Sequence, residues 1–419
     1  MAKAFSMLPA AFIATTTAVK GLNISLATTN LQLARMTKFL KASKLTVLLA
    51  GIGLLTVPLY NWATAEEEVN EICKKYSQQP NIYESIYYLG RDCFYGILVI
   101  LITSLLRDYL NPVVLFLGYS IVMGTVVMGL WVLGHECGHG AFGRNTFEND
   151  FFGFILHSFL LVPYFSWKYS HSKHHKYTNH LVLGETHVPA TKKGGRLLKI
   201  VHNAVGDDAF PIINIIIHLF IGWPLYLFTN ESGGTVMTDL KTPIDKSKFK
   251  DHFHSNSQVM PNSFGGKIEI STIGCLGTIC SMFYFLGWDS LFWYFGPYLV
   301  INAWLVLYTW LHHTHPDVPH YGKDTFTFLR GALSTIDRPY SSFINHLHHN
   351  IGSTHVAHHV KYSVPHYRAE ALTKELKVVL GKYYNYDSKP IISALYHTSK
   401  TCHYVDELEG VQKYKSYIK

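Results

Sequence analysis

The chain of 419 residues is 48% hydrophobic and only 15% charged, and its formal net charge is +8. Soluble domains carry about 25% charged residues, so this composition argues against a soluble protein and favours a membrane protein. The basic residues form no dense run with interleaved aromatic residues, which argues against nucleic-acid binding and leaves anionic lipid as the better match for the positive charge.

The N-terminal residues 1–65 contain six basic residues and no acidic residue. This composition is typical of a targeting peptide, and an amphipathic arm in the cytosol has the same character. We therefore separate residues 1–84, an N-terminal arm for which both interpretations stay open, from a main domain that we expect at residues 85–419.

The main domain contains four segments that match a transmembrane helix, which needs about 20 apolar residues. They are residues 85–106, 112–133, 271–288 and 291–311. Few residues separate the first segment from the second and the third from the fourth, so we expect two helical hairpins. The predicted fold class is an all-α integral membrane protein with four transmembrane helices.

Three further apolar segments are weaker candidates for crossing the membrane. Residues 151–165 are too short, and residues 209–228 contain Pro211 and Pro224. We therefore expect both segments to lie in the membrane interface. Residues 46–62 are ambiguous, and the N-terminus changes sides of the membrane if they cross it.

The 25 histidines are nearly as numerous as the 28 acidic residues, and eight of them form three clusters. The clusters are His135 and His139 in GHECGHG, His171, His174 and His175 in HSKHH, and His355, His358 and His359 in HVAHH. Spacings of three and four residues place side chains on one face of a helix. A ninth candidate is His312, His313 or His315 in WLHHTHP. Eight or nine imidazoles exceed the ligands of one metal ion, so the pattern predicts two ions with four to five ligands each.

The three clusters must share one side of the membrane if they build one site. This requires an even number of crossings between residues 175 and 355, which the hairpin at residues 271–311 provides. The loop that follows the second cluster is rich in lysine. The positive-inside rule therefore predicts a cytosolic helical cap that carries all three histidine clusters.

The motif HECGH, taken alone, is the signature of a zinc peptidase with Glu136 as its general base. A membrane zinc peptidase would use one zinc ion and would leave both HxxHH clusters without a role. A histidine-rich metal transporter would carry its histidines within the spans rather than at their ends. An all-nitrogen pair of metal sites beside a bilayer instead indicates oxygen activation on a lipid chain.

The sequence around the clusters contains the motifs HECGHGAF, WKYSHSKHHKYTNHL, GWPLYLF, HHTHPDVPHYG, LRGALSTIDRPY and HHNIGSTHVAHHVKYSVPHY. In these motifs and their order the chain resembles the membrane-bound acyl desaturases, in particular their Δ12/ω-3 group. The resemblance covers about residues 85–415. It implies a non-haem di-iron centre that uses O2 and two electrons to remove two hydrogens from an acyl chain.

The resemblance also implies roles for individual residues. The ligands of two iron ions would be His135, His139, His171, His174, His175, His313, His355, His358 and His359. Glu136, His315, His349 and Asn350 are expected to support these ligands or a metal-bound water rather than to bind metal directly. No catalytic side chain is expected beyond the metal centre.

Substrate, partners and location follow from the same resemblance. We expect Δ12 desaturation of an oleoyl chain to linoleoyl on a phospholipid or on acyl-CoA, with an ω-3 (Δ15) desaturase or an acyl hydroxylase as alternatives. The sequence has no His-Pro-Gly-Gly haem segment, so the expected electron donor is a separate protein, cytochrome b5 with its reductase. The expected location is the endoplasmic reticulum membrane, with plastid and mitochondrial membranes left open.

Overall fold

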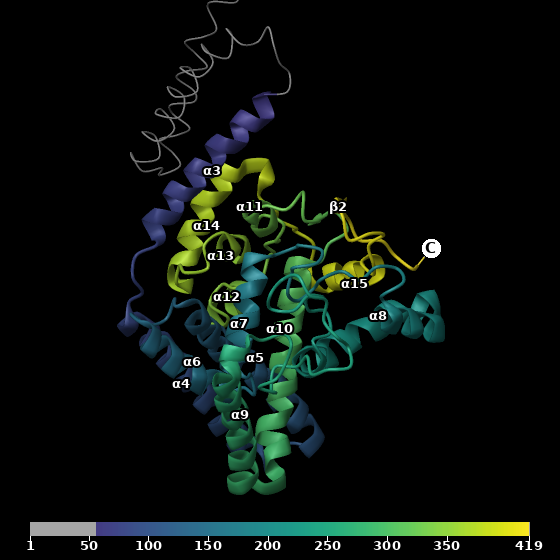
Figure 1. The fold of residues 1–419 in the computed structure, drawn as a ribbon. Coiled ribbons are helices and arrows are strands. Elements are labelled where there is room, and N and C mark those ends of the chain that lie inside the picture. Colours follow the sequence, from purple (N-terminus) through teal and green to yellow (C-terminus); the bar gives the residue numbers. More distant parts are fainter. Residues whose placement is uncertain (1–55, 419) are drawn as a thin grey trace, which may run out of the picture. The chain divides into compact units, whose positions relative to one another are not determined.

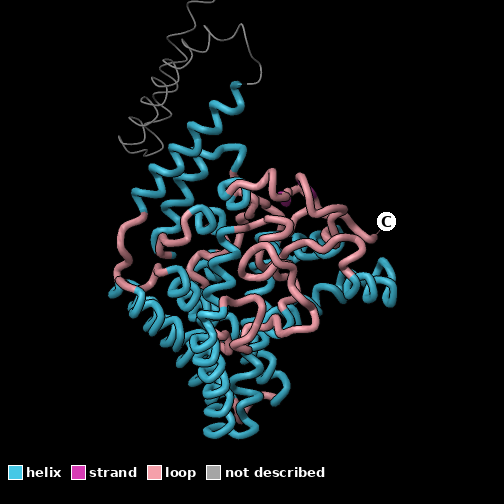
Figure 2. Tube along the Cα trace, viewed as in Figure 1, coloured by secondary structure: helices cyan, strands magenta, loops and turns pink. Residues whose placement is uncertain are grey.

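The computed structural model describes residues 56–418, and the regular structure of this range is mostly helical (Figures 1 and 2). The contacts divide the chain into a first unit, residues 1–67, and a second unit, residues 68–419. Helix α3 (Thr56–Tyr76) crosses this division. The acid-free leader and most of the apolar segment at residues 46–62 lie outside the described residues, and the elements below belong to the second unit.

The first two predicted apolar segments lie in helices α4 (Ile82–Leu106) and α5 (Pro112–His139), which pack against each other. Asn81 and Asn111 cap these helices, since each side chain accepts a hydrogen bond from a backbone N–H of the first turn. Helix α5 continues six residues beyond the predicted segment. The first histidine cluster therefore lies on the last turns of a long helix whose C-terminal half is buried.

The other two predicted apolar segments lie in α9 (Gly265–Leu286) and α10 (Gly296–His313). A 3-10 turn, η2 (Gly287–Asp289), and a π-helical turn, η3 (Leu291–Phe295), connect them. Helix α10 packs along α5. This packing requires glycine at position 124, because a Cβ atom there would lie 2.5 Å from Val300 Cβ.

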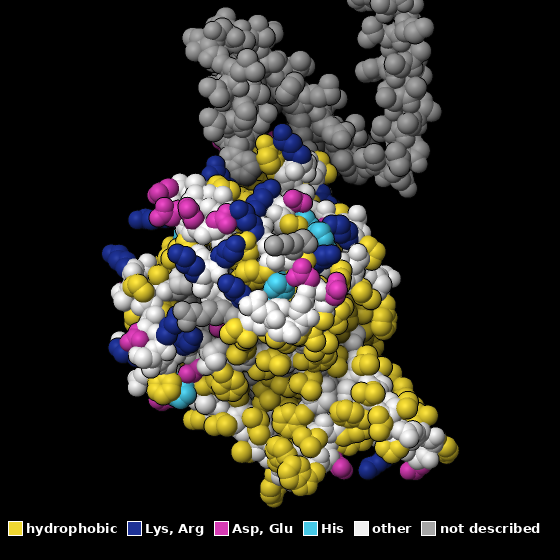
Figure 3. All heavy atoms as spheres, turned by 90° about the vertical axis from the view of Figure 1, so that its right-hand side faces the viewer, with side chains coloured by type: hydrophobic (Ala, Val, Ile, Leu, Met, Phe, Trp, Pro, Cys, Tyr) yellow, Lys and Arg dark blue, Asp and Glu magenta, His cyan; other side chains and the backbone are white. Residues whose placement is uncertain are grey.

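Apolar side chains cover the outer surface of the α9–α10 end. Tyr284, Phe285 and Trp288 are 84%, 77% and 80% exposed. Figure 3 shows hydrophobic side chains over the lower part of the surface, whereas most Lys, Arg, Asp and Glu side chains gather above them. An exposed apolar surface of this extent is typical of a protein that is embedded in a bilayer.

Five helices of the described range have the length and hydropathy of a membrane span, one more than the four expected from the sequence. The additional one is α8 (Arg196–Thr229), which includes the segment 209–228 that we predicted to lie in the interface. It is broken at Gly206, which has φ 76° and ψ 174°, and it contains Pro211 and Pro224. The four-span layout therefore stays a prediction.

Two short helices bring the second histidine cluster to the first. Helices α6 (Thr146–Phe159) and α7 (Tyr164–Lys176) meet at an angle of 105°. Gly153 lies at their contact, where a Cβ atom would be 2.3 Å from the Tyr164 ring. The sharp bend turns α7 back towards the end of α5, against which it packs.

The remaining elements are short, and most of them lie with α7 at the end of the second unit opposite to the α9–α10 turn (Figure 1). They are η1 (Asn262–Phe264), β1 (His320–Tyr321), α11 (Phe328–Ala332), α12 (Ser342–Leu347), α13 (His355–Val360), α14 (His366–Leu380), η4 (Gly381–Tyr383), α15 (Ile391–Thr401) and β2 (Val411–Gln412). Strands β1 and β2 pair antiparallel, with His320 opposite Gln412. The main buried cluster is formed largely by residues of α5, α6, α7, α8, α10 and α15.

Candidate metal centre

The first cluster occupies the final turns of α5. His135 and His139 are four residues apart, and their Nε2 atoms lie 3.1 Å from each other. The glycine that precedes His135 makes room for a neighbouring helix, since a Cβ atom at Gly134 would lie 2.3 Å from the His157 ring. The helix ends directly after His139 at Gly140, whose φ is +71°. A left-handed residue at this position is a common helix terminator.

The second cluster lies on α7 and faces the first. His171 Nε2 is 3.0 Å from His139 Nε2, and His175 Nε2 is 3.2 Å from His171 Nε2. The indole of Trp167 stacks on the His171 ring with 4.5 Å between ring centroids. The stacking and the helical spacing fix the direction in which these rings point.

The third cluster forms the six-residue helix α13, all of which is buried. His358 Nε2 lies 3.2 Å from His175 Nε2. His355 Nε2 lies 3.0 Å from Nε2 of His313, the last residue of α10, and His313 Nε2 lies 3.2 Å from His174 Nε2.

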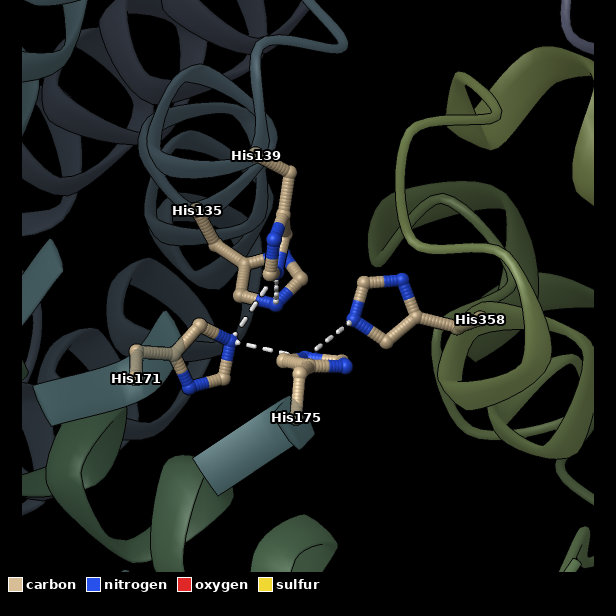
Figure 4. A group of neighbouring side chains, drawn as sticks. All are labelled: His135, His139, His171, His175 and His358. Carbon is tan, nitrogen blue, oxygen red and sulfur yellow. Dashed lines mark hydrogen bonds between the residues drawn. The ribbon is translucent and has the colours of Figure 1, made fainter. Parts of the chain in front are cut away.

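The nine predicted ligands therefore form two groups. In the five-imidazole group, one ligand atom of every residue lies within 4.8 Å of the others (Figure 4), and its members are His135, His139, His171, His175 and His358. The four-imidazole group contains His174, His313 and His359, which meet the same limit, and His355, which adjoins His313. Four separate segments contribute, which are the ends of α5 and α10 and the helices α7 and α13.

The spacing of the ring nitrogens fits metal ions. Two nitrogen ligands about 2.1 Å from one ion and at right angles to each other are about 3.0 Å apart. The nitrogen–nitrogen distances of 3.0 to 3.2 Å within each group match this value. Imidazole suits iron, zinc, copper and nickel, so the donor set alone does not choose among these metals.

The protonation state of the third cluster also fits metal binding. Burial, together with neighbouring imidazoles, holds the pKa values of His355, His358 and His359 well below their ordinary value of 6.5. These rings are therefore neutral at physiological pH, which is the form in which histidine binds metal.

Polar groups outside the two groups orient the ligands. The His174 Nδ1–H donates a hydrogen bond to the Glu185 carbonyl oxygen at 2.6 Å, which leaves Nε2 free to face the other ligands. The hydroxyl of Thr178 lies 3.0 Å from His359 Nδ1. The carboxylate of Glu185 pairs with the buried Lys173 at 3.2 Å, which holds the loop after α7 in place.

Thr178 and Glu185 were not predicted from the sequence, although both follow the second cluster closely. Thr178 lies in the turn after α7, three residues after His175, and this spacing is a local signal because such a hydroxyl can donate to a carbonyl oxygen of the preceding helical turn. His312 also belongs to this surrounding shell, since its ring stacks on His355 with 4.0 Å between centroids.

The four predicted supporting residues are placed differently from one another. Glu136 contacts a ligand, with Oε1 3.5 Å from His135 Nδ1. His349 lies further away and bonds the buried Asp92 at 2.7 Å. His315 lies 3.8 Å from Asp387 and belongs to neither group of described histidines. Asn350 has φ +61° in the turn before α13, where its carbonyl oxygen accepts the Thr354 hydroxyl.

A cavity of about 300 Å³ adjoins the histidines. Ligands from both groups line one part of it, including His135, His174 and His355. The rest is lined mainly by apolar and aromatic residues of α5, α8 and α10, among them Trp131, Ile217, Trp223, Leu305 and Val306. The cavity can therefore place a hydrocarbon chain directly beside both metal positions.

The sequence is similar to those of several known proteins. The sequence model of the fatty acid desaturase family matches residues 111–390. A Δ12 fatty acid desaturase of Calendula officinalis is 42% identical over 70% of this chain and 74% of its own length. A Δ12 fatty acid desaturase of Mortierella alpina is 35% identical over 83% of this chain and 90% of its own length. An oleoyl-12-hydroxylase of Ricinus communis is 39% identical over 71% of this chain and 74% of its own length.

Proposed function

The chain belongs to the fatty acid desaturase family, and on that premise we propose that it introduces a cis double bond at Δ12 of an oleoyl chain to give linoleoyl. The observation that carries this proposal is the pair of converging imidazole groups in the wall of an apolar cavity. The names of the Δ12 desaturase relatives support the regiochemistry.

The five-imidazole and four-imidazole groups would each hold one iron ion. Bound iron would supply the activation of O2, and two hydrogens of the acyl chain, two further electrons and two protons would reduce one O2 to two waters. The protein binds and orients the acyl chain and holds the metal ligands in place. The apolar cavity binds the chain and excludes water, while Glu185 and Thr178 fix the rings of His174 and His359.

We propose the four-span layout with a cytosolic site for this chain. His358 Nε2 and His175 Nε2 lie 3.2 Å apart, which requires an even number of membrane crossings between α7 and α13. Helices α9 and α10 supply two crossings, so α8 would lie in the interface despite its hydropathy. The break at Gly206 and the prolines Pro211 and Pro224 within the helix support an interfacial position.

The domain boundary, location and partners are also part of the proposal. Residues 85–419 would form the desaturase domain, with residues 1–84 as a separate arm. The location would be the endoplasmic reticulum membrane, as a soybean relative named for that compartment suggests. Cytochrome b5 with its reductase would supply the electrons, and a phospholipid or acyl-CoA would carry the acyl chain.

A hydroxylase is the second candidate function, because the Ricinus communis relative is named an oleoyl-12-hydroxylase. The same two imidazole groups and the same cavity could serve desaturation or hydroxylation. In desaturation a second hydrogen is removed from the chain, whereas in hydroxylation an oxygen atom is inserted. The zinc peptidase interpretation of HECGH would leave seven of the nine converging imidazoles unused, and the family match does not support it.

Expression in a yeast that makes only monounsaturated fatty acids tests the proposal. We expect new linoleate, identified by mass spectrometry of a derivative that locates the double bond between C12 and C13. A 12-hydroxy product would favour the hydroxylase. Conversion of fed linoleate to α-linolenate with oleate untouched would favour the ω-3 activity, and no new product with the protein present would contradict the proposal.

A further inference from the structure

We propose that Asp337 and Arg338 are positioning residues for the four-imidazole group, and that weakening them releases the metal of this group before the metal of the five-imidazole group. This rests on the proposed function, because it requires that both groups bind ions. Neither residue is a predicted ligand, and both lie in the motif LRGALSTIDRPY between α11 and α12.

Asp337 fixes the start of α13. Its side chain is fully buried, and Oδ1 accepts the backbone N–H of Val356 at 2.9 Å. The Tyr384 hydroxyl donates to Oδ2. The first turn of a helix has unpaired N–H groups and favours a negative charge. A carboxylate at this point therefore determines where the six residues of α13, and the ligands on them, lie.

Arg338 ties the end of α10 to the segment before α13. Its side chain is fully buried, and Nε donates to the Leu311 carbonyl oxygen at 3.1 Å. Its backbone N–H donates to the Gly352 carbonyl oxygen at 3.3 Å. The guanidinium also pairs with Asp387 at 2.5 Å, which balances its charge.

The same segment makes a further bond to α10, from the Ile336 N–H to the His312 carbonyl oxygen at 3.0 Å. The last residues of α10 are therefore bonded at both Leu311 and His312, immediately before His313. The planar guanidinium of Arg338 contacts Leu311 and Asp387 in two fixed directions, which the single ammonium of lysine does not reproduce.

The two metal groups depend on this segment to different extents. Helices α10 and α13 contribute His313, His355 and His359, which are three of the four members of the four-imidazole group. They contribute only His358 to the five-imidazole group, whose other four members lie on α5 and α7. A small displacement of α10 and α13 should therefore disturb the metal position of the four-imidazole group much more than that of the five-imidazole group.

The experiment measures iron bound per chain in purified protein during titration with a chelator. We expect the wild type to hold two irons and Asp337→Ala to lose one of them at a chelator concentration that is roughly 10- to 100-fold lower, the usual effect of losing a group that supports a ligand. Asp337→Asn keeps an acceptor for the Val356 N–H and should restore much of the loss. Asp92→Asn is a matched control, because Asp92 is 1% exposed and bonds His349 outside both groups.

Double variants assign the weakened site. In a His355→Ala background the four-imidazole group is already damaged, so Asp337→Ala should no longer lower the chelator concentration at which iron is lost. In a His139→Ala background, which damages the five-imidazole group, Asp337→Ala should still lower that concentration. The proposal would be overturned if Asp337→Ala kept both irons up to the chelator concentration that removes them from the wild type, or if it lost both irons together. If Asp337→Ala does not give monodisperse protein, Arg338→Lys is judged by the same two outcomes. A wild type that holds fewer than two metal ions would instead contradict the proposed function itself.

Discussion

Glu136 Oε2 accepts the backbone N–H of His366 at 2.8 Å, while its other oxygen lies 3.5 Å from His135 Nδ1. One carboxylate thus joins the first histidine cluster on α5 to the start of α14. A peptidase base would have to be free to take a proton from water, whereas this carboxylate is 2% exposed and already holds a backbone amide.

We therefore expect Glu136→Gln to retain iron and measurable desaturation. The glutamine oxygen can still accept the His366 N–H, and the loss of the second carboxyl oxygen beside His135 should reduce activity by about 10- to 100-fold. Linoleate formation per unit of membrane protein measures the effect. Complete inactivity in a variant that still holds two irons would show that the carboxylate does more than orient His135.

Single ligand substitutions should abolish activity. His358→Ala removes a member of the five-imidazole group and His174→Ala a member of the four-imidazole group. We expect no detectable linoleate from either variant, although both should accumulate in membranes because the apolar helices insert without the metals. His254→Ala is the control, since this half-exposed ring bonds Asp251 outside both groups. Wild-type turnover in either ligand variant would refute the ligand assignment.

The cavity predicts a matched pair of glycine substitutions. Gly222 of α8 lines the cavity, where a Cβ atom would lie 3.7 Å from Val306, and Gly277 of α9 has no atom within 4 Å. Overpacking of a fitted site costs about 1–3 kcal/mol. Gly222→Leu should therefore weaken binding of the acyl chain roughly 5- to 150-fold, and Gly277→Leu should leave it unchanged. Equal linoleate formation by the two variants would show that the chain does not occupy this cavity.

The position of α8 can be tested with inserted protease sites. A site after Lys193 and one after Ser247, both in exposed loops on either side of α8, should be cut together in intact vesicles whose cytosolic face is outward. A site after Trp288, in the turn that follows α9, should be protected. Cleavage after Lys193 with protection after Ser247 would mean that α8 crosses the membrane.

The regular parts of the fold could be predicted because their signals are local. Mostly apolar segments of about 20 residues correspond to α4, α5, α9 and α10, and the spacing within each cluster is typical of the helices on which the histidines lie. Helix α8 was assigned to the interface from its prolines and polar residues, although its length and hydropathy also suit a span. Whether a segment of this composition crosses the membrane depends on the elements that pack against it, not on its own sequence alone.

The distribution of nine imidazoles into groups of five and four could not be predicted. His174 and His175 are adjacent in sequence, yet they belong to different groups because neighbouring residues on a helix point in directions about 100° apart. Contacts such as Asp337 with Val356 join segments that are distant along the chain. Asn350 was a candidate to hold a metal-bound water, and its side-chain role stays a prediction.

His313 is the last residue of α10, so in the proposed span layout the chemistry takes place at the edge of the hydrocarbon core. The 18 residues of α10, from Gly296 to His313, rise about 27 Å, nearly the full thickness of that core of about 30 Å. The twelfth carbon of a lipid tail resides near the middle of the membrane, so it cannot be oxidised where it rests. With a phospholipid as the acyl carrier, the enzyme must extract the tail from the lipid interior, and the apolar cavity offsets a cost of about 0.8 kcal/mol for each methylene that would otherwise meet water. Stiffness of the surrounding lipid should then influence turnover, because each catalytic cycle would begin by pulling one tail away from its neighbours.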